Sequence, residues 1–310
     1  MIHLVCCIDE KYIQHCGVML ISLFENNPNH NFAVHIISND MTNDDKCILS
    51  DIIKKYENNV FFYYIDGKWV ESLPLFEGDH ISLATYYRLF LPIILPDAID
   101  KVLYLDCDLI VVSDIIGLWN TDLKNKPLAA IAESTAYLSD DNFVRLMYDN
   151  KYLYFNAGVL LINLDYWRKN NCVAMCMQYL EKCRSRIRWH DQDILNGVFH
   201  DCWVQLPVRY NALQGYYQAY FFDSVNVDSA IKENVLNELK SAVIVHFCAK
   251  NKPWDFYNQH PLRFLYYEYL KKSRWENYVP RFCVSWYFLK NLLRNILVKL
   301  GIKKTYYINI

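Results

Sequence analysis

Short apolar runs alternate with helix-like segments at the start of the chain, and this alternation constrains the fold more than any other feature. Residues 2–8, 32–38 and 60–65 are apolar runs typical of buried strands. Residues 12–26 and 44–56 carry apolar side chains at helical spacing. Strands that alternate with helices form parallel sheets with helices packed on them. We therefore predict an α/β fold that begins with a parallel-sheet, nucleotide-binding half.

Composition excludes several classes of protein. The 310 residues suggest one large or two modest domains, and a hydrophobic content of 53% is enough for a buried core. The net charge of −2 does not indicate a protein that binds nucleic acid. The 11 cysteines are odd in number and form no CxxC pair, so we expect reduced thiols in a cytoplasmic protein. We also expect neither a signal peptide nor a spanning helix, which needs roughly 18 apolar residues.

Two aspartates separated by one residue interrupt an apolar run at residues 101–112, which we otherwise expect to form one buried strand. Asp106 and Asp108 are costly in a buried strand unless something neutralises them. Side chains at i and i+2 lie on the same side of an extended backbone, so both carboxylates would face one point. Such oxygen ligands suit a hard cation such as Mn²⁺ or Mg²⁺. Two turn or helix-capping carboxylates at a strand exit would give the same pattern.

Other polar groups follow predicted strands. Asp9 comes after the first apolar run, and His246 ends a short run at residues 242–247 that is followed by Lys252. Open α/β sheets bind ligands outside the carboxyl ends of their strands, so we expect these groups to share a crevice with the paired aspartates. A neutral imidazole can complete a metal site, and a lysine can neutralise a diphosphate. A histidine at a strand end is also commonly structural.

The segment around Asp191 opens a predicted helix over residues 192–199. Asp191 and Asp193 can serve as first-turn carboxylates that the helix dipole favours. A helix N-terminus is equally a rigid place to hold polar groups near a reacting carbon. The chain has neither GxGxxG nor a Walker A motif, so a glycine-rich loop does not hold any phosphates.

Together these segments resemble glycosyltransferase family 8, the retaining nucleotide-sugar transferases of GT-A fold. The resemblance covers residues 1–255 and is strongest to bacterial lipopolysaccharide and lipooligosaccharide galactosyl- and glucosyltransferases. It implies a Rossmann-like mixed sheet flanked by helices. The motifs that carry it, in family order, are ISLATYYRL (81–89), VLYLDCD (102–108), YFNAGVLLINL (154–164), DQDILN (191–196), HFC (246–248) and KPW (252–254).

The resemblance implies a metal and a nucleotide. Asp106, Asp108 and His246 match the ligands of Mn²⁺ (or Mg²⁺), which bridges the phosphates of a UDP-galactose or UDP-glucose donor. Asp9 and Tyr12 match the positions that hold the uracil.

Further positions match residues around the donor sugar. Arg88 matches a residue near the sugar and the diphosphate, and Lys252 matches the lysine on the leaving diphosphate. Asn156, Asp191 and Gln192 match residues around the anomeric carbon.

Two further positions match the acceptor side of the family's site, and two others depart from the family pattern. His80 and Thr85 match acceptor-side positions. Ala249 stands where relatives usually carry glycine beside the phosphate, and Lys11 stands where close relatives have a small polar residue. The departures at Ala249 and Lys11 affect how the donor would lie in the site.

The implied reaction is transfer of galactose or glucose, with retention, to a saccharide acceptor such as the growing lipopolysaccharide core. The amide oxygen of Gln192 is a feeble nucleophile, which favours front-face attack over a covalent intermediate. A self-glycosylating, glycogen-priming type of transferase and a non-catalytic nucleotide-sugar or glycan-binding protein remain alternatives. The intact acids argue against the second of these.

The C-terminal segment differs from the rest, because it lacks acidic residues from residue 277 onward. We predict a catalytic domain over residues 1–278 and a basic amphipathic segment over residues 279–310 that associates with the inner face of the cytoplasmic membrane. A helix packed on the domain or bound to a partner protein would fit the same pattern. The apolar residues at helical spacing are Leu289, Leu292, Leu293, Ile296 and Leu300.

Overall fold

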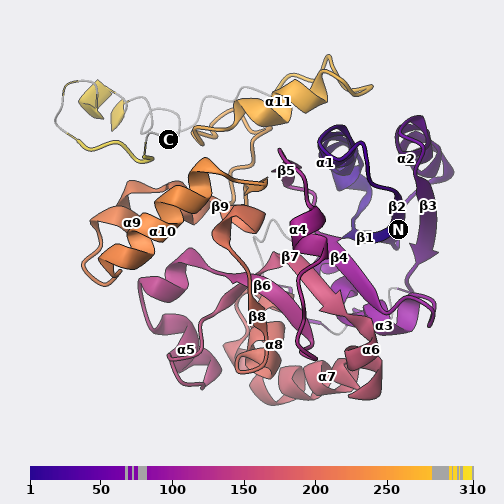
Figure 1. Cartoon of the computed structure of the whole chain (residues 1–310), viewed down its shortest axis with the longest axis horizontal. Coiled ribbons are helices and arrows are strands. Elements are labelled where there is room, and N and C mark those ends of the chain that lie inside the picture. Colours follow the sequence, from indigo (N-terminus) through magenta and orange to yellow (C-terminus); the bar gives the residue numbers. More distant parts are fainter. Residues whose placement is uncertain are drawn as a thin grey trace.

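The computed structural model of the chain confirms the predicted α/β fold (Figure 1). It describes residues 1–66, 69–71, 73–75, 82–280, 293–294, 296–298, 300 and 303–308. His80, Leu289 and Leu292, which the sequence singled out, lie outside these residues.

The elements follow the predicted order of strands and helices. Those of the first half are β1 (Ile2–Cys7), η1 (Glu10–Tyr12), α1 (Ile13–Glu25), β2 (Phe32–Ser38), α2 (Asn43–Lys55), β3 (Asn59–Tyr64), η3 (Leu83–Phe90), α3 (Leu91–Ile94), β4 (Lys101–Leu105), β5 (Leu109–Val111), α4 (Ile116–Trp119), β6 (Leu128–Ala132), η4 (Ser134–Tyr137) and α5 (Asp141–Leu146). Those of the second half are β7 (Phe155–Asn163), α6 (Leu164–Lys169), α7 (Cys172–Cys183), η5 (Arg184–Arg186), α8 (His190–Phe199), β8 (Val204–Gln205), η6 (Val208–Asn211), β9 (Ala212–Leu213), η7 (Gln214–Tyr217), α9 (Ala219–Asp223), α10 (Ser229–Lys240), β10 (Ile244–His246) and α11 (Phe264–Leu270).

A mixed sheet of order β3-β2-β1-β4-β7-β6-β8 forms the centre of the molecule. Strands β3, β2, β1 and β4 are parallel, whereas β7 runs antiparallel to both of its neighbours. A second sheet of order β5-β10-β9 lies beyond the end of β4. The parallel half is the part that the alternation of strands and helices predicted.

Neighbouring residues of the central strands belong to two separate apolar layers, because side chains alternate along a strand. Leu4 and Cys6 of β1 belong to the layer that contains α1 and α2, whereas Val5 belongs to the layer that contains α7 and α8. Leu105 and Tyr104 of β4 divide in the same way. Both faces of the sheet are therefore apolar, and charged groups must collect at the strand ends.

The run at residues 101–112 is not one strand, contrary to the sequence-based expectation. Strand β4 ends at Leu105, a bend carries Asp106 and Asp108, and β5 begins at Leu109 in the second sheet. Between two apolar layers a strand interior offers the carboxylates no polar partners, whereas the end of the sheet does. The aspartates therefore mark the place where the chain changes sheets.

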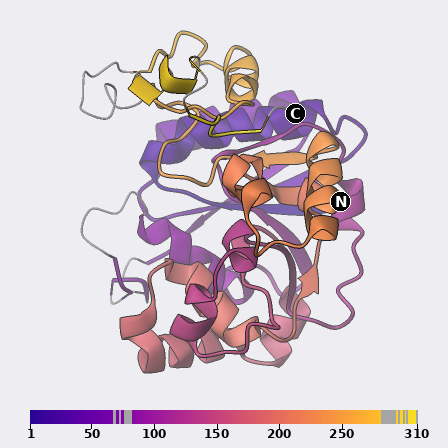
Figure 2. The ribbon, with the colours of Figure 1, turned by 90° about the vertical axis from the view of Figure 1, so that its left-hand side faces the viewer.

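The last described residues return to the main domain (Figures 1 and 2). Tyr307 pairs with Gln218 in an antiparallel bridge, and the carbonyl of Tyr306 accepts a hydrogen bond from the N–H of Ala219 (2.9 Å). The Tyr307 hydroxyl also accepts a hydrogen bond from the side chain of Gln214 (2.7 Å). Residues 303–308 thus pack on the domain, and the boundary at residue 278 stays a prediction.

Across the part of the chain that the structure describes, we find no helix with both the length and the apolar character required to cross a membrane.

A buried histidine makes stability depend on pH. His15 of α1 stacks on Trp254 at a centroid distance of 3.4 Å and contacts the hydroxyl of Tyr266 (2.8 Å). Burial lowers the pKa of His15 to about 3, from an ordinary value of 6.5. Between these values the unfolded chain binds a proton that the folded protein does not, so the free energy of unfolding falls as pH drops below about 6.5.

We expect His15→Phe to reduce this dependence, because Phe keeps the ring stack and cannot titrate. From pH 7 to pH 5 the variant should lose about 2 kcal/mol less stability than the wild type, as measured by urea unfolding. An identical pH slope for both proteins would contradict this assignment.

Candidate active site

A crevice of about 720 Å³ opens at the carboxyl ends of the central strands, a volume typical of small-molecule sites. The structure brings all ten residues that we selected as catalytic, nucleotide-binding or metal-binding into its wall. They are Asp9, Tyr12, Arg88, Asp106, Asp108, Asn156, Asp191, Gln192, His246 and Lys252.

His246 lies next to the paired aspartates because β10 and β5 are neighbouring strands of the second sheet. Strand β10 runs antiparallel to β5, which sets His246 opposite Leu109. Nε2 of His246 lies 3.0 Å from Oδ1 of Asp108 and 3.9 Å from Oδ2 of Asp106. One ligand atom from each of the three residues lies within 4.8 Å of the others.

A chain of side-chain amides orients the imidazole. Nδ1 of His246 lies 2.9 Å from Oδ1 of Asn211, whose amide nitrogen donates to Oδ1 of Asn156 (3.0 Å). That oxygen also accepts from the N–H of Gly158 (2.9 Å), so the network assigns the proton of His246 to Nδ1. The lone pair of Nε2 then faces one carboxylate oxygen of Asp108 and one of Asp106. A cation bound among these three acceptor atoms would satisfy all of them.

Gly158 makes this approach possible. A Cβ atom at this position would lie 2.3 Å from Cε1 of His246 and 2.6 Å from Oδ2 of Asp106. No side chain fits there without moving a candidate ligand.

Lys252 neutralises Asp108. Its ammonium donates to Oδ2 of Asp108 (2.5 Å) and to the carbonyl of Phe247 (3.2 Å). Burial raises the pKa of the Asp108 carboxyl, but the positive charge of Lys252 opposes this effect, and the pKa lies below its usual value. Asp108 is therefore an anion near neutral pH, as a metal ligand must be.

Arg88 joins the other two carboxylates. It is only 5% exposed, its Nη2 donates to Oδ1 of Asp106 (2.9 Å), and its Nε lies 3.0 Å from Oδ2 of Asp191. Burial disfavours the charged guanidinium, but the two carboxylates outweigh burial and raise the pKa of Arg88 above its usual value. Arg88 thus holds its charge inside the protein.

Asp191 projects from the first turn of α8 into the crevice. Its Oδ1 accepts a hydrogen bond from the Thr85 hydroxyl, whereas Oδ2 finds no aligned donor among the described residues. Burial raises the pKa of Asp191, and Arg88 opposes that shift. Oδ2 is buried and lies 3.0 Å from Nε of Arg88, so the guanidinium already compensates its charge.

Gln192 lies beside Asp191, but its amide oxygen is directed toward β7. Oε1 accepts hydrogen bonds from the N–H of Ala157 (3.0 Å) and the amide of Asn156 (3.2 Å). The amide nitrogen of Asn156 also donates to Oε2 of Glu133 (3.0 Å). The lone pairs of Gln192 are thus already engaged.

Asp193 has the structural role that its position in the first helical turn allowed. It is fully buried, pairs with Arg145 (2.5 Å), and accepts hydrogen bonds from the N–H groups of Arg188 and Trp189. Only Asp191 of this pair reaches the crevice.

The uracil-matching residues lie at one edge of the crevice. Asp9 caps η1, where its carboxylate accepts a hydrogen bond from the N–H of Lys11 (3.0 Å). Tyr12 ends η1 and contacts Trp254 edge to face at a centroid distance of 5.9 Å. Ala249 lines the crevice, whereas the Lys11 side chain is exposed.

Sequence reasoning missed Glu133. It follows β6, its carboxylate accepts hydrogen bonds from the N–H of Ser134 (3.1 Å) and from Asn156, and it lines the crevice. Burial raises the pKa of Glu133. The rule that placed Asp9 and His246 at strand ends applies to it equally.

A mixed, Rossmann-like sheet that ends in an aspartate pair facing a nucleotide-sized crevice is the architecture of GT-A glycosyltransferases. The chain belongs to Glycosyl transferase family 8, whose sequence profile matches residues 3–257.

Known proteins of this kind align along most of the chain. General stress protein A of Bacillus subtilis is 28% identical over 279 residues, which span 88% of this chain and 94% of the relative. Lipopolysaccharide 1,3-galactosyltransferase of Salmonella typhimurium is 26% identical over 275 residues, or 87% and 78% of the two chains. The galactosyltransferase LgtC, solved with donor and acceptor sugar analogues, superposes with a TM-score of 0.80 at 26% identity, covering 90% of this chain and 98% of LgtC.

Loss of Arg88 should destabilise the protein strongly. In Arg88→Met the carboxylates of Asp106 and Asp191 lose their shared cation, and removing one partner of a buried ion pair costs about 3–5 kcal/mol. Urea unfolding without added metal measures this loss.

The matched control is Lys169→Met, which breaks an ion pair of 2.7 Å with Asp165 on the surface. There we expect a loss below about 1 kcal/mol. Equal losses in the two variants would show that Arg88 does not compensate the buried acids.

Proposed function

We propose that this family 8 member is a metal-dependent, retaining hexosyltransferase. It transfers galactose or glucose from a UDP-sugar to a saccharide acceptor, the growing lipopolysaccharide or lipooligosaccharide core. The convergence of Asp106, Asp108 and His246 on one point of the crevice carries the proposal. The related Salmonella galactosyltransferase supports the choice of substrates.

The three residues suit Mn²⁺ (or Mg²⁺), since they offer two carboxylates and one imidazole nitrogen whose proton sits on the far side of the ring. The bound ion would supply charge neutralisation for the leaving diphosphate. The ion pair with Lys252 already sets one positive charge against Asp108, which supports the assignment of this carboxylate as a cation ligand.

The protein's own residues bind the rest of the donor and stabilise the leaving group. Asp9 and Tyr12 hold the uracil, and Arg88 orients the donor through Asp106 and Asp191. The ammonium of Lys252 contacts the leaving diphosphate and stabilises the negative charge that develops there.

Retention follows from front-face attack. A covalent intermediate on Gln192 would require its amide oxygen to abandon hydrogen bonds from Ala157 and Asn156. We infer instead that the acceptor hydroxyl attacks on the side that UDP leaves and passes its proton to the departing phosphate oxygen. The carboxylate of Asp191, which lines the crevice, stabilises the positive charge on the anomeric carbon.

The acceptor is lipid-linked and the enzyme is cytoplasmic, at the inner face of the membrane. Leu293, Ile296 and Leu300 in the C-terminal segment are 58%, 47% and 66% exposed, with the basic residues Arg294 and Lys303 nearby in sequence. Exposed apolar side chains beside basic ones suit the surface of an anionic membrane.

A donor panel tests the reaction. With Mn²⁺ the protein should release UDP from UDP-galactose or UDP-glucose, and not GDP from GDP-mannose. Asp108→Asn should lower the rate at least about 100-fold, because it removes a charged ligand.

Asp165→Asn, which changes an exposed carboxylate on α6, is the control and should keep full activity. If no nucleotide sugar is consumed with Mn²⁺ or Mg²⁺, the chain is a binding protein on this fold rather than an enzyme.

Membrane association is tested by substitution rather than truncation, because truncation also removes the docked residues 303–308. The triple variant Leu293→Gln, Ile296→Gln, Leu300→Gln should bind anionic vesicles about tenfold more weakly than the wild type in co-sedimentation. Val225→Gln, at an exposed apolar residue elsewhere, is the control. Equal binding by all three proteins would remove the membrane assignment.

A further inference from the structure

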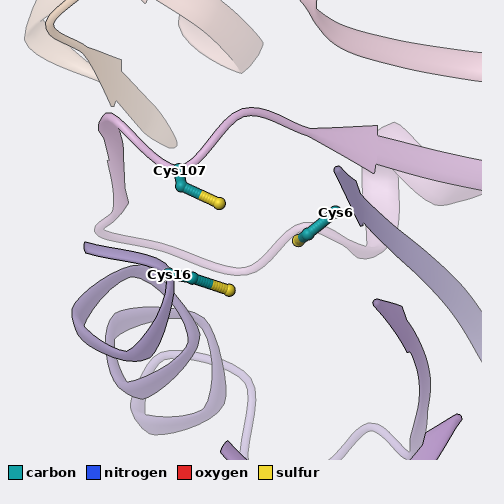
Figure 3. A group of neighbouring side chains, drawn as sticks. All are labelled: Cys6, Cys16 and Cys107. Carbon is teal, nitrogen blue, oxygen red and sulfur yellow. The ribbon is translucent and has the colours of Figure 1, made fainter. Parts of the chain in front are cut away.

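Three thiols meet immediately beside the aspartate pair. Cys6 lies on β1, Cys16 lies on α1, and Cys107 stands between Asp106 and Asp108. Figure 3 shows the three side chains directed toward one another, and their sulfur atoms all lie within 4.8 Å of each other. The proposed reaction uses none of them.

We propose that Cys6, Cys16 and Cys107 form a three-sulfur site for one soft, thiophilic metal ion such as Zn²⁺ or Cd²⁺. This site is distinct from the hard-ion site of the aspartates and His246, because thiolates select soft ions whereas carboxylates select hard ones. The proposal stands independently of the proposed sugar transfer.

The spacing of the sulfur atoms suits one ion. A metal–sulfur distance of about 2.3 Å in tetrahedral geometry places sulfurs about 3.8 Å apart. The three sulfurs therefore need to approach each other by no more than about 1 Å. They come from a strand, a helix and the bend between β4 and β5, so the folded protein assembles the site.

Burial determines how an ion would enter. Cys6 and Cys16 are completely buried, whereas Cys107 is 5% exposed and lines the crevice. An ion would reach Cys107 first and then the two inner sulfurs. A fourth ligand such as water would reach the ion from the crevice, along the side of Cys107.

The charge balance of the three-sulfur site also allows a divalent ion to bind. Each thiol releases its proton to solvent and donates a sulfur lone pair to the ion. Three thiolates and one divalent ion carry a single net negative charge, which is less costly to bury than three bare thiolates.

Occupancy would affect the neighbouring site. Contraction toward Cys6 and Cys16 moves Cys107, and with it the flanking Asp106 and Asp108. We therefore expect Cd²⁺ in the sulfur site to weaken Mn²⁺ binding at the aspartates.

Ordinary core packing is the competing explanation, since free cysteines are commonly small buried apolar residues. The test is a Cd²⁺ titration of the full-length protein, reduced with a phosphine and saturated with Mn²⁺. The ultraviolet sulfur-to-cadmium charge-transfer band reports sulfur ligands alone, and equilibrium dialysis counts the bound ions.

We expect one tightly bound Cd²⁺ per wild-type chain and at least a tenfold weaker affinity in Cys16→Ala. Cys6→Ala should behave in the same way, and it decides the test if Cys16→Ala does not fold by circular dichroism. The matched control is Cys176→Ala, which removes a fully buried thiol of α7 and should keep the band.

The proposal fails if the wild type shows no band, or if the band persists in a folded variant that lacks Cys16 or Cys6. It also fails if the band disappears in Cys176→Ala.

Discussion

Buried carboxylates matched to buried cations are the interaction on which the rest of the structure depends. Arg88 holds Asp106 and Asp191 together, and Lys252 holds Asp108. The central sheet is apolar on both faces, so these charges lie only where the strands end. The same ion pairs that make the acids tolerable also gather the groups needed to bind a charged donor. Stability and ligand recognition therefore rest on one set of contacts.

The change of sheet after β4 explains how distant parts of the sequence meet. The chain leaves the central sheet at Leu105 and enters the second sheet at Leu109. That second sheet also contains β10, which delivers His246 to Asp108 across 138 positions of sequence. The bend between the sheets thus serves as the meeting point of the two halves of the crevice, and Gly158 leaves the space that this meeting needs.

Sequence patterns predicted the regular elements well, because apolar periodicity directly encodes buried faces. The run at residues 32–38 is β2, and the strand-end rule found Asp9 and His246. Local patterns did not separate Asp191 from Asp193, which share one helical turn. Their partners, Arg88 for Asp191 and Arg145 for Asp193, lie far away in the sequence. Neither did local patterns reveal Asn211 or the two-residue strands β8 and β9, whose roles arise from partners far along the chain.

The amides of Asn211, Asn156 and Gln192 form a linked series in which each group fixes the orientation of the next. Reversing one amide would set two donors or two acceptors face to face at its neighbour. Substitutions along this series are therefore epistatic: a change tolerated at one position depends on what occupies the other two. Among natural homologues these three positions should covary, and the imidazole at the end of the series should be lost only together with them.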